Sequence, residues 1–265
     1  MTKFALVGAA LLAMTAAALQ SAVAQPVSWA GLYAGGNVGY SWGKSKTDVS
    51  YFNSTTGAAI APPTGSTTNP SFNLDGVIAG LQLGNNWQNG KLVFGVEADI
   101  QWSGQKGTGN SLCAGTGTGG PCMPPLTFLP AGAAGTTFAL EQKLAWFATL
   151  RGRLGHTITP TWLAYVTGGL AFGNIKTNST LSGFTGVGAA SSVAASSSAT
   201  KTGWTLGVGV EGVISGKWTA KVEYLYMDLG TVSGSVTNTA ILVRSDFSSK
   251  ITDNILRVGL NYKLN

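Results

Sequence analysis

The chain has 265 residues, of which only 10% are charged, and it carries 38 glycines and a formal net charge of +6. Soluble domains average about 25% charged residues, so this composition is unusual for a soluble domain. No run of basic residues accompanies the net charge, and we therefore expect no nucleic-acid partner. The length suits one β-domain without an internal boundary.

The N-terminus has the pattern of a secretory signal peptide. Lys3 is followed by an uncharged apolar stretch, Phe4–Leu19, and then by the small residues Ala22-Val23-Ala24. This order predicts a cleaved signal peptide over residues 1–24 and an exported domain over residues 25–265. No later segment has the roughly 20 consecutive apolar residues of a membrane helix. The exported domain therefore either stays soluble or crosses a membrane as a closed barrel.

Eight segments alternate apolar and polar residues with a period of two, which predicts strands with one apolar and one polar face. The last segment is a terminal strand, whose backbone groups stay unpaired unless another strand meets it, so we expect a closed ring. The segments are Trp29–Gly43, Phe72–Trp87, Leu92–Trp102, Leu140–His156, Thr161–Asn174, Thr202–Ile214, Lys217–Leu229 and Leu256–Leu264.

The connections between these segments alternate between short and long. Short turns are expected at Asn89-Gly90, Thr157–Pro160 and Ser215-Gly216. Long polar loops are expected over Ser45–Ser71, Gly104–Ala139, Ile175–Lys201 and Gly230–Ser249. This pattern is typical of an all-β, eight-stranded antiparallel up-and-down transmembrane barrel with short periplasmic turns and four long extracellular loops. Within the third loop, the Ser/Ala/Gly-rich tract from Gly183 to Thr200 is expected to be mobile and exposed.

Aromatic residues fall at both ends of the predicted strands. Two aromatic girdles bounding an apolar band are expected of a membrane barrel, because amphipathic rings are most stable at the level of the lipid headgroups. The predicted periplasmic girdle contains Trp29, Trp87, Trp162, Trp218 and Tyr262. The predicted outer girdle contains Trp42, Trp102, Phe172, Trp204 and Tyr226.

Eight charged residues lie on the strand face opposite the apolar one. An Arg or Lys facing lipid near the midplane costs roughly 2–4 kcal/mol, so we expect these side chains inside the barrel. The interior of eight strands is only about wide enough for side chains, and buried charges need partners, which predicts a paired network. The eight residues are Glu97, Asp99, Arg151, Arg153, Glu211, Lys221, Glu223 and Arg257.

The sequence leaves three roles open for this network. It could be a polar core that holds the barrel shut, the selectivity lining of a pore, or a catalytic carboxylate pair. The catalytic role is the weakest, because no activated nucleophile or Ser/His/Asp set accompanies the carboxylates. We therefore expect no enzyme and no cofactor. His156 is the only histidine, so a metal site is not expected. Cys113 and Cys122 are expected to form a disulfide in an oxidising compartment.

Several strand motifs resemble a known family. They are WAGLYAGGNVGY at residues 29–40, WFATLRGRLG at 146–155, WTLGVGVE at 204–211, KVEYLYMDLG at 221–230 and LRVGLNY at 256–262. Together they resemble the small porin-like outer-membrane proteins of alphaproteobacteria, over essentially the whole exported chain. The resemblance implies an eight-stranded outer-membrane barrel, often an abundant surface protein. Its partners would be outer-membrane lipid and, during biogenesis, periplasmic chaperones and the barrel-assembly machinery.

One residue departs from the family pattern. Members usually end in phenylalanine, which helps the assembly machinery to recognise the final strand, whereas Leu264-Asn265 stands here. We expect Asn265→Phe to preserve or improve membrane insertion.

The leading functional hypothesis is a non-enzymatic structural barrel that supports envelope integrity and presents loops at the surface. The alternatives are a porin-like passive channel for small solutes and a loop-mediated binding or adhesion protein. For the last of these, Leu112–Leu129 would be the first segment to test, because binding often resides on loops held by a rigid scaffold. The sequence does not identify an extracellular partner.

Overall fold

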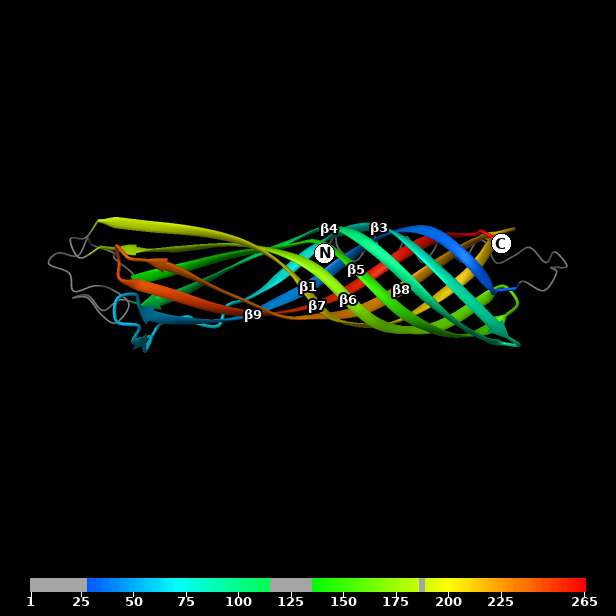
Figure 1. Ribbon diagram of the computed structural model, residues 1–265, viewed down its shortest axis with the longest axis horizontal. Helices are drawn as coiled ribbons and strands as arrows, with labels where there is room; N and C mark the ends of the chain where they lie inside the picture. Colours follow the sequence, from blue (N-terminus) through cyan, green and yellow to red (C-terminus); the bar gives the residue numbers. More distant parts are fainter. Residues whose placement is uncertain (1–27, 115–134, 186–188) are drawn as a thin grey trace.

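The computed structural model describes residues 28–114, 135–185 and 189–265, and these form one long antiparallel barrel (Figure 1). The described residues contain no helix that is long and apolar enough to cross a membrane. The strands are β1 (Gly31–Asn53), β2 (Ala59–Ile60), β3 (Ser71–Asn89), β4 (Leu92–Ala114), β5 (Gly135–Thr159), β6 (Trp162–Phe184), β7 (Ala190–Ser215), β8 (Trp218–Asn238) and β9 (Val243–Lys263).

Eight long strands close the ring, and the prediction of an up-and-down barrel is confirmed. From β3 onward each strand pairs with the next along the chain, while β1 pairs with both β3 and β9. The described residues contain nine strands in total, because the two-residue strand β2 pairs with β1 at Tyr51↔Ile60, beyond the point where the β1–β3 pairing ends at Lys46↔Ser71. The sequence pattern missed β2, since two residues are too few to show a period.

Tight turns join the strands at one end of the barrel, which we call the turn end. Gly90 and Gly216 lie in these turns with φ values of 59° and 53°. Tight hairpin turns need residues with positive φ, a conformation that glycine adopts readily. At the opposite loop end, the chain connects strands through residues 54–70, 115–134, 185–189 and 239–242. The C-terminus lies at the turn end, where the side-chain Oδ1 of Asn265 accepts a hydrogen bond from the backbone N–H of Leu32 at 2.7 Å.

Most of the residues that we predicted to be long loops are in fact strands. β1 continues to Asn53, β4 to Ala114, β6 to Phe184 and β8 to Asn238, well beyond the predicted strand ends. Residues 190–200, which we predicted to be mobile, form the first half of β7. The barrel is therefore much longer than expected, and among the described residues the connection 239–242 between β8 and β9 is much shorter than the predicted loop Gly230–Ser249.

The reason for this difference is that the apolar face can reverse along a strand, as it does on β1. On β1 the outward side chains are apolar as far as Trp42, and then become Lys44 and Lys46. The inward side chains beyond that level include the buried residues Val49 and Tyr51. A sheet in water hides its apolar face, whereas a sheet in lipid exposes it. The reversal thus marks the level at which the barrel leaves the membrane, and a pattern search with one fixed apolar face stops there.

Register shifts at Trp102/Gln105, Leu144/Trp146 and Asp228/Thr231 are irregularities of the ladder near this level. An extra residue on one strand changes which face the following side chains occupy. Strict alternation along the predicted strand Leu140–His156 places Leu144 on the outer apolar face with Trp146. That prediction is wrong, because Leu144 is buried inside the barrel.

Candidate functional site in the barrel lumen

The lumen is filled by side chains in successive layers. Nearest the turn end, Trp29 and Tyr165 pack with the apolar side chains of Val93 and Leu163. A network of charged residues lies next. Beyond it, an apolar layer occupies the level where the strands leave the membrane, and its buried members are Ile78, Leu144, Phe147, Ala171, Ile175, Leu225, Met227, Leu229, Val232, Ile251 and Ile255.

The part of the barrel nearer the loop end is also packed. Buried hydroxyl and amide groups form a polar layer, in which Ser45 donates to Gln142 Oε1 at 2.7 Å and Thr47 lies 2.8 Å from Ser249 Oγ. A second apolar layer follows, with Phe138 and Phe247 in contact at a ring-centroid distance of 5.7 Å. Burial raises the pKa of Tyr51 in this layer, although the hydrogen bond with Ser111 opposes the shift.

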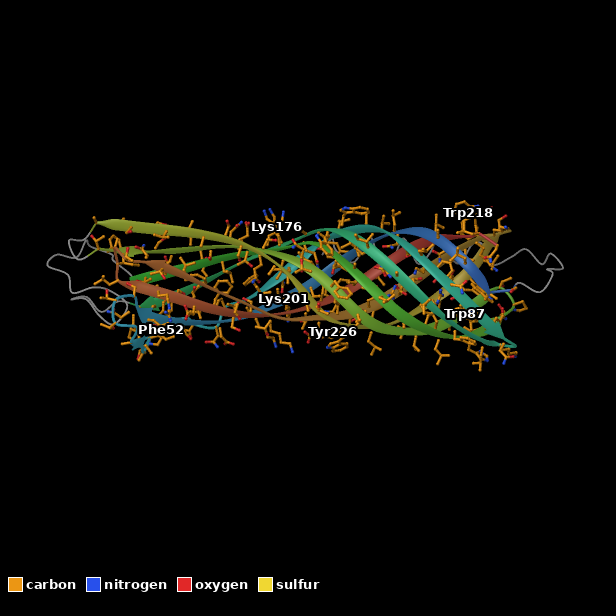
Figure 2. All side chains as sticks on the ribbon, in the orientation of Figure 1. Phe52, Trp87, Lys176, Lys201, Trp218 and Tyr226 are labelled. Atoms are coloured by element: carbon orange, nitrogen blue, oxygen red, sulfur yellow. The ribbon has the colours of Figure 1, made fainter. Side chains whose placement is uncertain are left out.

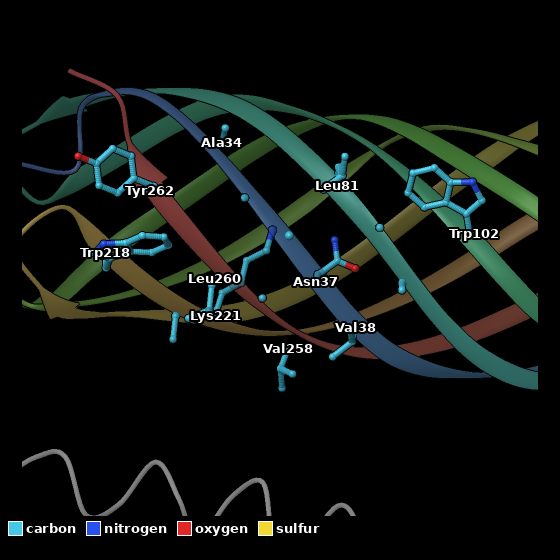
Figure 3. A pocket seen from close by; sticks show the side chains of 16 residues that line it. Ala34, Asn37, Val38, Leu81, Trp102, Trp218, Lys221, Val258, Leu260 and Tyr262 are labelled. Carbon is cyan, nitrogen blue, oxygen red and sulfur yellow. The ribbon is translucent and has the colours of Figure 1, made fainter.

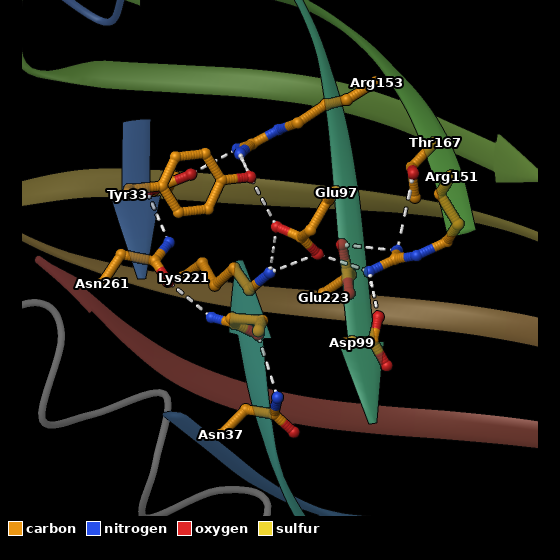
Figure 4. Close-up of polar contacts among 12 residues, drawn as sticks. Tyr33, Asn37, Glu97, Asp99, Arg151, Arg153, Thr167, Lys221, Glu223 and Asn261 are labelled. Carbon is orange, nitrogen blue, oxygen red and sulfur yellow. Dashed lines mark hydrogen bonds and ion pairs between the residues drawn. The ribbon is translucent and has the colours of Figure 1, made fainter. Parts of the chain in front are cut away.

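The eight charged residues predicted to face the lumen do lie together inside it, and Figure 4 labels all of them except Glu211 and Arg257. Each of them is at most 6% exposed. They come from five strands: Glu97 and Asp99 from β4, Arg151 and Arg153 from β5, Glu211 from β7, Lys221 and Glu223 from β8, and Arg257 from β9. Four acids and four bases make the network neutral in formal charge.

Three acid–base pairs follow directly from strand register. Glu97 lies opposite Arg151, Glu211 opposite Lys221, and Glu223 opposite Arg257. Of these, Arg151 forms an ion pair with Glu97, and Arg257 Nη2 lies 2.5 Å from Glu223 Oε2. Opposite charges on directly facing residues stabilise a sheet, so each such pair contributes to its own part of the wall.

Further ion pairs cross the lumen and join distant strands. Arg257 donates to both carboxylate oxygens of Asp99 at 3.2 Å. Lys221 Nζ lies 2.8 Å from Glu97 Oε2, and Arg153 pairs with Glu211. Lys221–Glu97 joins strands on opposite sides of the ring, β8 and β4, and Arg257–Asp99 joins β9 to β4. Arg153–Glu211 passes over the single strand β6. The pairs therefore link strands that are not neighbours in the sheet and fill the space between them.

Two tyrosines complete the network, and the sequence did not reveal their role. Tyr33 of β1 donates its hydroxyl hydrogen to Glu97 at 2.7 Å, and Tyr165 of β6 donates to Glu223 at 3.0 Å. The guanidinium of Arg153 lies 3.7 Å from the centroid of the Tyr165 ring. Alternation placed Tyr33 on the inward face, but only the tertiary structure identifies the carboxylate that it meets.

Glycines make room for these two rings. A Cβ atom on Gly84 would lie 2.3 Å from the Tyr33 hydroxyl oxygen. A Cβ atom on Gly209 would lie 2.4 Å from Cζ of Tyr165. Real side chains do not approach so closely, and each tyrosine therefore lies against the wall only because its neighbour lacks a side chain.

The outer surface near the turn end is apolar and bounded by exposed aromatic residues (Figure 2). Trp87, Trp162, Trp218 and Tyr262 face outward near the turn end. Trp42, Trp102 and Trp204 face outward at the other boundary, where Phe172 and Tyr226 are half-buried. Trp29 differs from our prediction: it is 3% exposed and packs inside the barrel, because it precedes β1 and folds into the lumen.

A shallow groove of about 850 Å³ crosses the apolar band over β1, β3, β8 and β9 (Figure 3). Small residues such as Ala34, Gly36 and Ala79 form its floor, and Trp102, Trp218 and Tyr262 are among its larger lining residues. The groove faces the membrane, and its lining offers the apolar contacts that a lipid chain makes anywhere on this surface.

The predicted disulfide is only partly within the described residues. Cys113 is buried and disulfide-bonded. Cys122, the chain's only other cysteine, lies outside the described residues, as do the predicted signal peptide and most of Leu112–Leu129. Among the described residues, no group of three or more His, Cys, Asp or Glu side chains is placed to hold a metal ion.

An eight-stranded ring with an apolar outer band, aromatic borders and a charged, packed interior defines a transmembrane β-barrel of the outer-membrane type. The chain belongs to the family of the outer membrane protein beta-barrel domain, whose model matches residues 8–263. It is an outer-membrane protein, so the turn end is periplasmic and the loop end extracellular.

Curated relatives support this assignment. The chain is 36% identical to the 31 kDa outer-membrane immunogenic protein of Brucella melitensis, over 96% of each chain. It is 28% identical to the 25 kDa outer-membrane immunogenic protein of Brucella abortus, over 91% of this chain and 82% of that one. Among solved structures, the outer membrane protein OprG of Pseudomonas aeruginosa matches 91% of this chain and 100% of that one, at 11% identity and a TM-score of 0.44.

Proposed function

We propose that this protein is a closed, non-enzymatic structural barrel of the outer membrane that presents a surface antigen and conducts no solute. The observation that carries the proposal is the filled lumen. Apolar layers lie on both sides of the charge network, from Trp29 near the turn end to Phe138 and Phe247 near the loop end. A pore lining needs charged groups in contact with water, whereas these charges are buried and bonded to each other.

The charge network also argues against catalysis. Glu97 and Asp99 are each bonded to two or more cationic side chains, and Glu223 is bonded to two arginines. A general acid or base must reach a substrate proton within hydrogen-bond distance, and these carboxylates face one another in a filled interior. The network therefore supports the structural role of the three that the sequence left open.

The surface role rests on two observations. The strands continue past the apolar band and carry polar outward residues such as Lys46, Asp48 and Ser50 on β1, so a large part of the barrel stands in the extracellular space. The two Brucella relatives are named as immunogenic outer-membrane proteins. We infer the same surface-antigen role for this chain.

Conductance in a planar bilayer tests the closed lumen. Refolded protein, with insertion established by heat-modifiable mobility on gels, should give a silent bilayer. Stable and reproducible current steps would overturn the proposal and favour a passive channel. In that case, substitutions at Arg151, Arg153, Glu97 and Glu211 should alter ion selectivity.

Antibody binding tests the surface role. A short epitope inserted between Thr239 and Ala240, in the connection between β8 and β9, should be detected on intact cells as well as on permeabilised cells. The matched control carries the same epitope at Gly90, in a turn-end hairpin, and should be detected only after permeabilisation. Detection of the first epitope only after permeabilisation would contradict the proposed orientation and exposure.

A further inference from the structure

Three lysines form a row on the outer surface just beyond the extracellular aromatic rim. Lys106 of β4 lies directly opposite Lys143 of β5, and Lys143 lies directly opposite Lys176 of β6. All three are exposed, and Figure 2 labels Lys176 at the outside of the wall. We call these three residues the lysine row.

Like charges on directly facing residues destabilise a sheet, so the row is an unfavourable arrangement for the barrel by itself. Two carboxylates flank it. Glu141 Oε1 lies 3.3 Å from Lys143 Nζ, and Asp75 lies opposite Lys106 on β3. Three lysines against two carboxylates leave the patch with a net positive charge. A bound anion would remove the repulsion.

The position of the row indicates what kind of anion could reach it. Trp102 and Trp146 lie opposite each other in register on the same outer face, and Phe172 continues the rim on β6. The lysines follow these rings by three or four residues along each strand, which is roughly 10 Å along a tilted strand. Aromatic rings lie at the headgroup level, so the lysines stand where the phosphates of outer-leaflet lipids lie.

An apolar strip lies on the same three strands on the membrane side of the rim. Ile100, Leu150 and Leu170 are 43%, 54% and 50% exposed to the outside. From the membrane outward, the surface thus presents first the apolar strip, then the aromatic rings and then the lysines. A membrane lipid has the matching order: its acyl chains, its glycan or glycerol, and its phosphate. A soluble anion would contact only the lysines, whereas a lipid would also contact the aromatic rings and the apolar strip.

We propose that the lysine row and the strip beneath it bind an outer-leaflet lipid whose headgroup carries phosphate groups. Lysine ammonium groups contact phosphate as flexible point charges, and their long stems can reach down over the aromatic rim. Asn178 Nδ2, which donates to Glu141 Oε1 at 3.1 Å, adds an amide donor next to the row.

The test uses the refolded full-length mature protein in detergent micelles. The probe is lipid A, a glucosamine disaccharide with two phosphates, and native mass spectrometry measures the lipid-bound fraction as its concentration rises. The double variant Lys106→Gln with Lys176→Gln keeps the Lys143–Glu141 pair. Lysines near an anionic surface contribute about fivefold in binding each, so this variant should bind about 25-fold more weakly.

The matched control is the double variant Lys91→Gln with Lys217→Gln, which removes the same charge from exposed turn-end positions. It should bind lipid A like the unmodified protein. The charge-conserving variant Lys106→Arg with Lys176→Arg should also retain binding, and it serves if the glutamine variant folds poorly. Unchanged binding by the glutamine variant, or equal losses in both glutamine doubles, would overturn the proposal.

Two further probes identify the source of the phosphate. Lipid A from which both phosphates have been removed should bind much more weakly, and binding equal to that of the intact lipid would contradict a phosphate site. Inorganic pyrophosphate at the same concentration should not displace lipid A. Complete displacement would mean that the lysines hold a soluble anion, which would overturn the assignment to a lipid.

Discussion

Arg151 contacts three carboxylates at once, which makes it a central residue of the interior network. Its Nη2 atom lies 2.9 Å from Asp99 Oδ2, its Nη1 atom lies 3.1 Å from Glu223 Oε1, and it also pairs with Glu97. Its positive charge therefore offsets the charge of three buried carboxylates. Its removal leaves several buried negative charges with too few cations.

The substitution Arg151→Met should therefore lower the free energy of unfolding by roughly 3–5 kcal/mol, as expected when one partner of a buried ion pair is removed. Urea unfolding of the protein in lipid vesicles, followed by tryptophan fluorescence, measures the change. The control is Lys250→Met, whose exposed ammonium lies 3.2 Å from Asp228. It should alter stability by less than about 1 kcal/mol. Equal effects of the two substitutions would contradict the assignment of the network as a stabilising core.

Gly209 provides a second test at this scale, because its missing side chain leaves room for the Tyr165 ring. Gly209→Ala should destabilise the barrel by about 1–3 kcal/mol through overpacking. In the control Gly152→Ala, the nearest atom to the new Cβ would be a backbone oxygen at 3.9 Å. Urea unfolding should show little change for that variant. A tolerated Gly209→Ala would mean that the ring of Tyr165 moves freely.

Residue-scale features were predictable from the sequence only in part. Alternation put the charged residues inside, because the side of a strand on which a residue lies follows from its position alone. The partners across the lumen, such as Asp99 for Arg257, depend on how eight strands are staggered around the ring. Trp29 was misplaced because it precedes the first strand and is not subject to its alternation.

At the scale of elements, β7 stands apart from the other long strands. It pairs with β6 as far as Phe184↔Ala190, but its pairing with β8 ends at Trp204↔Asp228. Within the described residues, 190–203 therefore have a strand partner on one side only. Most of residues 190–200 are exposed on both faces, in contrast to the half-buried strands around them. The barrel wall thus divides between β7 and β8 where it leaves the membrane.

Hydrogen exchange should reveal this division. Amides of residues 190–201 should exchange faster than those of 204–214 on the same strand. The reason is that the edge of β7 facing β8 has no strand partner over 190–201, and the side chains there make few buried contacts. Mass spectrometry of peptides from the refolded protein gives both rates in one experiment. Equal protection along the whole of β7 would show that another segment covers its edge.

The seam between β1 and β9 closes the ring, and it depends mainly on the backbone. Leu264 N donates to Leu32 O at 2.9 Å, which extends the ladder beyond the pair Tyr33↔Lys263. The side chain of Asn265 adds one acceptor, for the N–H of Leu32.

Asn265→Phe should therefore preserve or increase the folded fraction, since the backbone bonds remain and the family resemblance of the strand motifs implies an aromatic residue at this position. The heat-modifiable band on gels of isolated membranes measures that fraction. The comparison variant Asn265→Ala removes the acceptor without adding a ring. A clear fall in the folded fraction for Asn265→Phe alone would contradict the expectation.

At the scale of the whole molecule, the barrel has two parts that differ in both their interior and their surroundings. Near the turn end the outside is lipid and the inside is charged. Near the loop end the outside is water and the inside is apolar, as in a soluble barrel. The same strands run through both parts, because backbone pairing does not depend on which face of a strand is apolar, although β7 and β8 pair only in the membrane part.

Salt should have little effect on a barrel held by a neutral, buried network. At 1 M salt the screening length is about 3 Å, which weakens exposed pairs such as Arg244–Asp246. Buried pairs such as Asp99–Arg257 are screened far less. Raising KCl from 0.05 to 1 M should therefore change the free energy of urea unfolding by less than about 1 kcal/mol. A large loss of stability in salt would mean that water reaches the network.

The amino-acid sequence by itself determined the class of fold, the inward face of each membrane strand and the residues of the charge network. Each of these follows from the period-two geometry of a strand, which is a local property. The tertiary structure alone decided the length of the barrel, the packing that fills its lumen, the inward position of Trp29 and the row formed by Lys106, Lys143 and Lys176. These features depend on strand register and on the medium outside each part of the wall, and both arise only when distant segments are brought together.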